Sequence, residues 1–162
     1  MHNLYNYPSL NIILLKHKML FKILKTKEIK NKKITSVSVI IFNNFKEILA
    51  VKLLKRGWDI PGGHVEDGDR NIFETAKREV LEEAYVEIKD CKVSTIIRSY
   101  YYKVPTYMLI LSAKVGKIYE FNKNEESLDR KFMNPLHFLK CYSKNNNFEL
   151  MREIIKNAMK YS

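Results

Sequence analysis

The segment that most constrains the fold runs from Asn71 to Ala84, where apolar residues recur at every fourth position. Because side chains four residues apart stack along one side of a helix, this spacing predicts a helix with an apolar stripe. The stripe consists of Ile72, Ala76, Val80 and Ala84. Such a stripe would fix the helix to a sheet supplied by the rest of the chain.

The remaining sequence predicts strands on both sides of this helix and a second helix at the end. β-Branched and alternating residues predict strands at 34–42, 47–54, 91–102 and 106–115, and Phe132 is expected to start a short strand. The turn signal Asn43-Asn44 predicts a hairpin between the first two strands. A helix is predicted from Phe148 to Met159, with Leu150, Met151, Ile154, Ile155 and Ala158 as its apolar side. This order predicts an α+β fold with a mixed central sheet covered by helices.

Positive charge is concentrated at the start of the chain. The 162 residues carry 29 Lys and Arg against 18 Asp and Glu, a formal net charge of +11 that favours contact with anions. Residues 1–33 hold eight lysines and one glutamate, or +7 of this total. We therefore predict a basic, partly disordered N-terminal arm over 1–33 and one domain over 34–162. A solvated arm and an arm that binds RNA or membrane phosphates both remain open.

Cysteine content and hydropathy favour a cytoplasmic protein. Cys91 and Cys141 are too few for a disulfide framework and do not form a CxxC pair. The longest apolar run, from Leu10 to Leu15, falls short of the roughly 18–20 residues that cross a bilayer. Neither a transmembrane segment nor a secretory signal is expected.

Acidic residues cluster beside the apolar stripe of the predicted helix. Glu79, Glu82 and Glu83 are three and four residues apart and fall within an arc of about 100° on one face. They repel one another, and only Lys77 and Arg78 are near enough in sequence to compensate. Mg²⁺ or Mn²⁺ would resolve the repulsion, because these cations take oxygen ligands and share them with phosphates. The alternative is a solvated charged face.

A glycine-containing loop precedes this helix. Gly62 and Gly63 follow Pro61 and permit backbone conformations that bring carbonyls and amides close to a metal or a phosphate. The acidic residues Glu66, Asp67 and Asp69 come next.

Taken together, the loop and helix from Trp58 to Val86 resemble the signature of the Nudix (MutT-like) hydrolases. That signature is Gly, five residues, Glu, seven residues, Arg-Glu, an aliphatic, any residue, Glu-Glu, any residue, Gly and an aliphatic. The matching residues are Gly63, Arg78, Glu79, Val80, Glu82, Glu83 and Val86. The wider resemblance spans about 34–139 and implies a Nudix-type α/β/α sandwich.

Three departures from the signature stand out. Asp69 replaces the first glutamate, and eight residues instead of seven separate it from Arg78. Tyr85 replaces the closing glycine, so we expect Tyr85 to adopt the turn that glycine makes, with a positive φ that costs about 1 kcal/mol or more.

The resemblance implies a Mg²⁺-dependent pyrophosphohydrolase, with Mn²⁺ as an alternative ion, in which water attacks phosphorus. It implies metal ligation by Glu79, Glu82 and Glu83, joined by the Gly62 carbonyl, with Glu79 or Glu82 also serving as base. Arg78 would orient a neighbouring carboxylate, the alternative being a surface pair with Glu82. The expected substrate is a (deoxy)nucleoside triphosphate such as 8-oxo-dGTP. Relatives are often dimers, which leaves a homodimer open.

Two other functions remain open. The basic arm favours removal of pyrophosphate or a cap from RNA 5′ ends. Tyr85 and the extra loop residue favour a Nudix-fold nucleotide-binding module without catalysis.

Several residues outside the signature have two interpretations each. Glu125 and Glu126 would add a metal ligand or base, or belong to a polar loop. His64 would contact a phosphate or be an exposed loop residue. Further candidates are Lys52, Lys55 and Arg56 for steering anions and Tyr100, Tyr101 and Tyr102 for stacking a base, although strand tyrosines more often pack.

Overall fold

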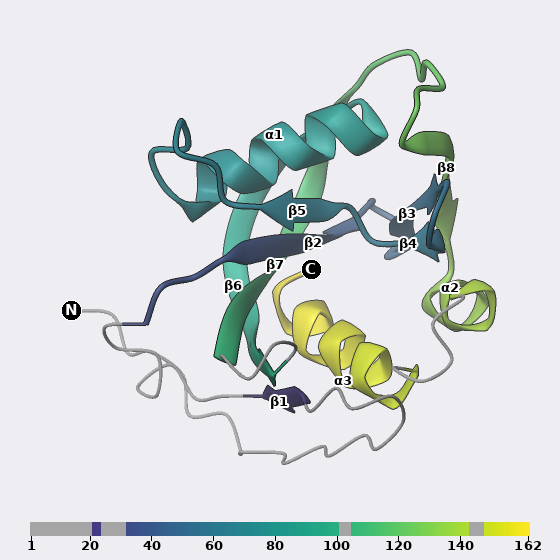
Figure 1. Cartoon of the computed structure of the whole chain (residues 1–162). Coiled ribbons are helices and arrows are strands. Elements are labelled where there is room, and N and C mark those ends of the chain that lie inside the picture. Colours follow the sequence, from purple (N-terminus) through teal and green to yellow (C-terminus); the bar gives the residue numbers. More distant parts are fainter. Residues whose placement is uncertain (1–20, 24–31, 101–104, 143–147) are drawn as a thin grey trace.

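The computed structural model describes residues 21–23, 32–100, 105–142 and 148–162. A mixed sheet lies between helices on its two faces (Figure 1). Helix α1 (Ile72–Ala84) covers one face, and α3 (Phe148–Ala158) covers the other beside the short α2 (Pro135–Cys141). A 3₁₀ turn, Met159–Tyr161, follows α3. This arrangement confirms the predicted α+β class and the α/β/α sandwich.

The sheet has the strand order β1-β6-β7-β2-β3-β4, with β5 paired to β2 and β8 paired to β3. The central pair β2–β7 is parallel, whereas the other described pairs are antiparallel, so the sheet is mixed as predicted. The strands are β1 (Phe21–Ile23), β2 (Ser36–Phe42), β3 (Ile48–Leu53), β4 (Gly57–Asp59), β5 (Gly62–His64), β6 (Val86–Tyr100), β7 (Pro105–Ile118) and β8 (Ser127–Met133).

The core lies on both faces of β2 because successive strand side chains point in opposite directions. Val39 and Ile41 pack in the cluster that includes Val80 of α1, whereas Ile40 packs in the cluster that includes Ile154 of α3. Val39, Ile40, Ile41 and Val80 are fully buried, and only 3% of Ile154 is exposed. Helix α1 is thereby fixed to the sheet through its apolar stripe.

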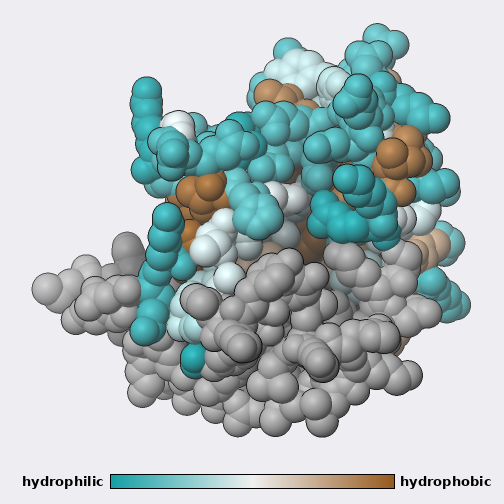
Figure 2. All heavy atoms as spheres, viewed as in Figure 1, coloured by the Kyte–Doolittle hydropathy of each residue, from teal (hydrophilic) through white to brown (hydrophobic). Residues whose placement is uncertain are grey.

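The surface outside this core is mainly polar. Figure 2 shows hydrophilic residues over most of the described part of one face, with hydrophobic residues in separate small spots. Among the described residues, no helix is both long and apolar enough to cross a membrane.

Some predicted elements differ from the structure. The strand predicted from Cys91 begins at Val86, directly after α1, and Phe132 lies near the end of β8 instead of starting a strand. The predicted hairpin pairs Phe42 with Ile48, but β3 then runs along β8. The elements β1, β4, β5 and α2 were not predicted. Each of these three strands has only three residues, too few for a readable periodicity, and α2 has only seven.

Part of the predicted N-terminal arm is described by the structure. Phe21–Ile23 forms β1, which pairs antiparallel with residues 97–99 of β6. Most of the remaining arm lies outside the described residues, as do Tyr101 and Tyr102, and the side chain of Tyr100 is not described.

Both ends of α1 are capped by side-chain and backbone chemistry. The Asn71 side chain accepts hydrogen bonds from the amides of Phe73 (2.9 Å) and Glu74 (3.2 Å), which satisfies two N-terminal donors. Tyr85 ends the helix in the left-handed region, at φ 53° and ψ 44°, and its amide donates to the Leu81 carbonyl. Tyr85 therefore adopts the positive φ that replacement of the glycine predicted.

We expect Tyr85→Gly to be more stable than Tyr85→Ala by about 1 kcal/mol. Both substitutions remove the ring, which makes an edge contact with Phe121 at 5.6 Å between centroids, but only glycine relieves the positive φ. Urea unfolding of the two variants measures the difference. Equal stabilities would show that this position is not strained.

Candidate active site

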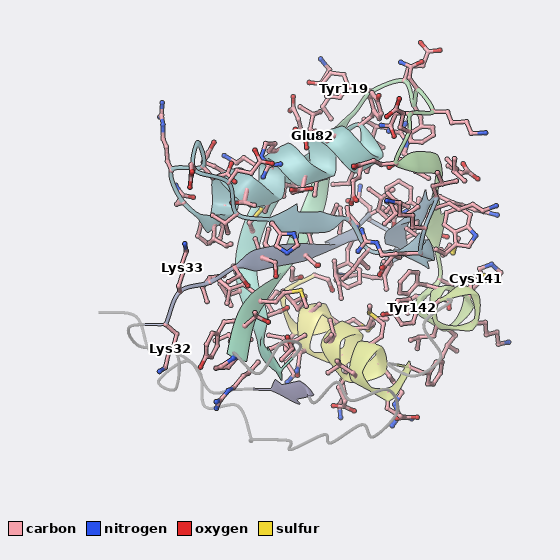
Figure 3. The ribbon with its side chains drawn as sticks, in the orientation of Figure 1. Lys32, Lys33, Glu82, Tyr119, Cys141 and Tyr142 are labelled. Carbon is pink, nitrogen blue, oxygen red and sulfur yellow. The ribbon has the colours of Figure 1, made fainter. Side chains whose placement is uncertain are left out.

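The acidic side of α1 faces solvent and the loop around β5, while its apolar stripe holds it on the sheet. Figure 3 shows Glu82 on this helix, on the side away from the central strands. The side chains of Glu79, Glu82 and Glu83 are not equivalent, since 13%, 58% and 5% of them respectively is exposed. The helix therefore presents one exposed and two largely buried carboxylates.

Arg78 is the centre of an ion-pair cluster. Its Nε and Nη2 donate to the two oxygens of Asp69 at 3.2 and 3.0 Å, a bidentate pair, and Nη2 also donates to the His64 carbonyl at 3.0 Å. Its Nη1 lies 2.9 Å from Glu79 and 3.2 Å from Glu82. Arg78 therefore contacts the neighbouring carboxylate of Glu79 and also forms the surface pair with Glu82 one turn away, the two contacts that the sequence left as alternatives.

Asp69 reaches Arg78 despite its short side chain and the extra residue that follows it. One of its oxygens also accepts from the Thr75 hydroxyl (2.9 Å) and from the Glu66 amide (2.9 Å). The hydrogen bonds from Arg78 and Glu66 hold the pKa of Asp69 well below its usual range. The loop is therefore closed around Arg78 even though it departs from the signature.

Glu83 is buried and held by the backbone of the loop. Its Oε2 accepts from the Gly62 amide at 2.9 Å, and its Oε1 lies 3.4 Å from Arg56 Nη2. Burial raises the pKa of Glu83 to about 7, although the Gly62 amide and Arg56 favour its charged form. Arg56 also lies 3.7 Å from the buried Asp59, a residue that the sequence did not single out.

In metal-free buffer, we expect the free energy of unfolding to fall as the pH rises from about 4.5 to about 7, because Glu83 loses its proton over this range. Its pKa is about 7 when folded and 4.5 ordinarily, so the folded state binds this proton more tightly. The contribution is fully present below pH 4.5 and is lost as the pH rises through 7. At about 1.4 kcal/mol per unit it reaches up to about 3 kcal/mol.

The measurement is urea unfolding of the wild type and Glu83→Gln between these two pH values. The variant should lose much of the slope of unfolding free energy with pH. An unchanged slope would contradict the raised pKa of Glu83.

The Glu79 carboxylate occupies the space that a side chain at position 63 would fill. A Cβ at position 63 would lie 2.3 to 2.5 Å from the three carboxyl atoms of Glu79. Burial is the main cause that raises the pKa of Glu79, against the favourable charge of Arg78. The glycine of the signature therefore has a physical role here, which is to admit a glutamate from the helix.

A pocket of about 290 Å³ lies beside Glu83. The two loop glutamates, Glu125 and Glu126, line the same cavity as Glu83. The lining residues are Leu53, Leu54, Lys55, Arg56, Glu83, Glu125 and Glu126. His64 and Lys52 are exposed and do not line this pocket.

The carboxylate oxygens around the site suit a divalent cation as ligands. Arg78 and Arg56 are the two arginines that pair with six carboxylates, which leaves four surplus negative charges when all six are ionised. The carboxylates belong to Asp59, Glu66, Asp69, Glu79, Glu82 and Glu83. Oxygen-rich, negatively charged sites of this kind are those that hard cations bind.

The carboxylates are not gathered around a single point. Within the described ranges, no three side chains from His, Cys, Asp and Glu form a group that would hold an ion as they stand. Glu82 is the member turned outward, and a side chain as exposed as this one changes rotamer at little cost. The site therefore fits a divalent ion in its chemistry and requires movement of Glu82.

Comparisons with known proteins agree with this geometry. A family model described as the NUDIX domain matches residues 32–155. No curated protein matches the sequence.

Solved structures share the fold at low sequence identity. The pyrophosphohydrolase BsRppH from Bacillus subtilis has a TM-score of 0.71 and 17% identity, covering 90% of this chain and 96% of that one. A mutator MutT protein from Bacillus halodurans has a TM-score of 0.59 and 17% identity, covering 74% and 80%. An Ap4A hydrolase from C. elegans has a TM-score of 0.56 and 17% identity, covering 78% and 99%. The family match over most of its length shows that the chain belongs to the Nudix family of pyrophosphohydrolases, which act on phosphoric anhydride bonds.

Proposed function

We propose that this chain uses Mg²⁺ to hydrolyse a diphosphate linkage in a nucleotide, with a (deoxy)nucleoside triphosphate such as 8-oxo-dGTP as the preferred substrate. The observation that carries the proposal is the surplus of carboxylates around Arg78 and Arg56 in a chain whose net charge is +11. Lys55 is exposed and lines the pocket that Glu83 borders, which suits a ligand with phosphates.

In the proposed site, Glu79, Glu82 and Glu83 would hold the ion together with the Gly62 carbonyl. The bound ion would neutralise phosphate charge and make a coordinated water more acidic. Arg78 keeps the Glu79 carboxylate in place through the 2.9 Å contact. Glu125 and Glu126 would add carboxylates from the loop that borders the pocket.

The reaction is a substitution at phosphorus. Water forms a new P–O bond, the bridging P–O bond breaks, and a triphosphate yields a nucleoside monophosphate and pyrophosphate. Glu79 or Glu82 accepts the proton of the attacking water. Glu79 is the better candidate, because Arg78 and the close approach of Gly63 hold its carboxylate in position.

The features that favoured a binding module without catalysis do not disrupt this site. Asp69 still makes a bidentate pair with Arg78 across the loop with one extra residue. Tyr85 still closes α1 in the left-handed region. Both observations support the catalytic interpretation.

A substrate screen tests the proposal. Nucleoside triphosphates, dinucleoside polyphosphates, ADP-ribose, nucleotide sugars and a 5′-triphosphate RNA would be incubated with Mg²⁺ or Mn²⁺, and products identified by ion-exchange chromatography. We expect monophosphate and pyrophosphate from a triphosphate, and no product with EDTA. Preference for the RNA would overturn the proposed substrate. Nucleotide binding measured by calorimetry, with no hydrolysis product from any substrate, would overturn the proposed catalytic activity.

A further inference from the structure

A third arginine, Arg130 on β8, joins two segments beside the site. Its Nη1 donates to the carbonyls of Ala84 (2.6 Å) and Tyr85 (2.9 Å), and its Nη2 donates to the Tyr119 carbonyl (2.5 Å). The guanidinium also lies over the Phe121 ring, 5.5 Å from its centroid. Figure 3 shows Tyr119 near the C-terminal end of α1. One side chain therefore fastens the end of α1 to the start of the loop at 119–126.

The far end of this loop is tied to the same helix and to Leu54, the residue that follows β3. The Asn124 side chain donates to the Glu82 carbonyl at 3.3 Å and accepts from the amides of Glu126 (2.9 Å) and Ser127 (2.6 Å). The Leu54 amide donates to the Glu126 carbonyl at 2.9 Å. The loop that brings Glu125 and Glu126 to the pocket is thus held at both ends against the elements that bear the other site residues.

Arginine is the residue type that this junction requires. The last turn of α1 contains no basic residue, and a cation near the helix C-terminus is favourable because the final carbonyls carry partial negative charge. The planar guanidinium directs several donors at once, whereas a lysine offers a single point charge. Lysine at position 130 would keep the charge but not the simultaneous contacts to the helix and the loop.

We propose that Arg130 is a positioning residue for hydrolysis, which places the Glu125–Glu126 end of the loop relative to Glu82 and Glu83. The proposal rests on the proposed function of this site. Arg130 does not line the pocket and acts on the reaction through the loop glutamates.

The experiment compares Arg130→Met and Arg130→Lys with Arg152→Met, which removes an exposed arginine paired with Glu149 on α3. We expect Arg130→Met to lower kcat at least tenfold with KM within threefold, Arg130→Lys to recover part of the loss, and Arg152→Met to match the wild type. Wild-type kcat in Arg130→Met overturns the proposal. If Arg130→Met does not fold by circular dichroism, Arg130→Lys takes its place in each comparison.

A double-mutant cycle separates positioning from a purely structural role. In a background with Glu125→Gln and Glu126→Gln, Arg130→Met should lower kcat less than twofold further. The full loss in that background would mean that Arg130 does not act through these glutamates, and would overturn the proposal. The same cycle is applied to Mn²⁺ affinity, measured by calorimetry. Arg130→Met should lower the affinity at least fivefold in the otherwise wild-type chain and should not lower it when Glu125 and Glu126 are already glutamine. If the wild type hydrolyses none of the screened substrates, the proposed function fails. Calorimetry still tests Arg130 in that case, because the measurement of Mn²⁺ affinity needs no turnover.

Discussion

Replacing Glu82 by glutamine is expected to lower the turnover of a nucleotide substrate by about 100-fold or more and to leave stability nearly unchanged. The side chain is 58% exposed and pairs with Arg78 at 3.2 Å, an exposed contact worth about 0.2–1 kcal/mol. In the proposed site, by contrast, the negative charge of Glu82 is needed to bind the divalent ion that neutralises the substrate phosphate. Steady-state kcat with Mg²⁺ and urea unfolding of the same samples measure the two effects.

Glu74→Gln is the matched control on the same helix. Glu74 is 47% exposed and pairs with Lys77 at 3.2 Å, so its loss changes charge and helix contacts to a similar degree. Turnover of this variant should stay within twofold of the wild type. Equal losses in the two variants would indicate a general effect of helix charge and would contradict a specific role for Glu82.

Replacing Gly63 by alanine is the second substitution with a large expected effect. The added methyl would lie within 2.5 Å of the Glu79 carboxyl atoms, so this carboxylate must leave its position beside Arg78. The clash involves the end of a flexible side chain, and we expect a stability loss of about 1–2 kcal/mol. Turnover should fall by about 10- to 100-fold, because a displacement near 1 Å at a reacting centre costs about that much.

Gly68→Ala is the control for this change. It lies in the same loop, and a Cβ built there meets nothing within 4 Å. Turnover within twofold of the wild type is expected for Gly68→Ala. If Gly63→Ala also retained full turnover, the placement of Glu79 beside Gly63 would have no part in the reaction.

The part of the site carried by α1 was predictable because its signals are local. The positive φ at Tyr85 was expected from the resemblance to the Nudix signature, which has a glycine at that position. The apolar stripe and the acidic side of α1 instead follow from helical spacing. These features depend on residues within a few positions of one another, which the sequence shows directly.

The contacts between distant segments were not predictable. Arg56 meets Glu83 across 27 positions, and Arg130 meets Tyr85 across 45. The sequence favoured anion steering for Arg56, whereas the structure pairs it with a buried glutamate. Such pairings depend on how β4 and β8 enter the sheet, and a strand as short as β4 gives no pattern from which its register could be inferred.

Anomalous diffraction from crystals soaked in Mn²⁺ would show whether these glutamates bind a divalent ion, because it locates the ion without requiring a substrate. We expect a manganese peak coordinated by carboxylate oxygens of Glu79, Glu82 and Glu83 at about 2.0–2.6 Å, with Glu82 turned away from Arg78. A peak elsewhere, with Glu82 still paired to Arg78 and no ion beside Glu79 and Glu83, would contradict this placement of the ion.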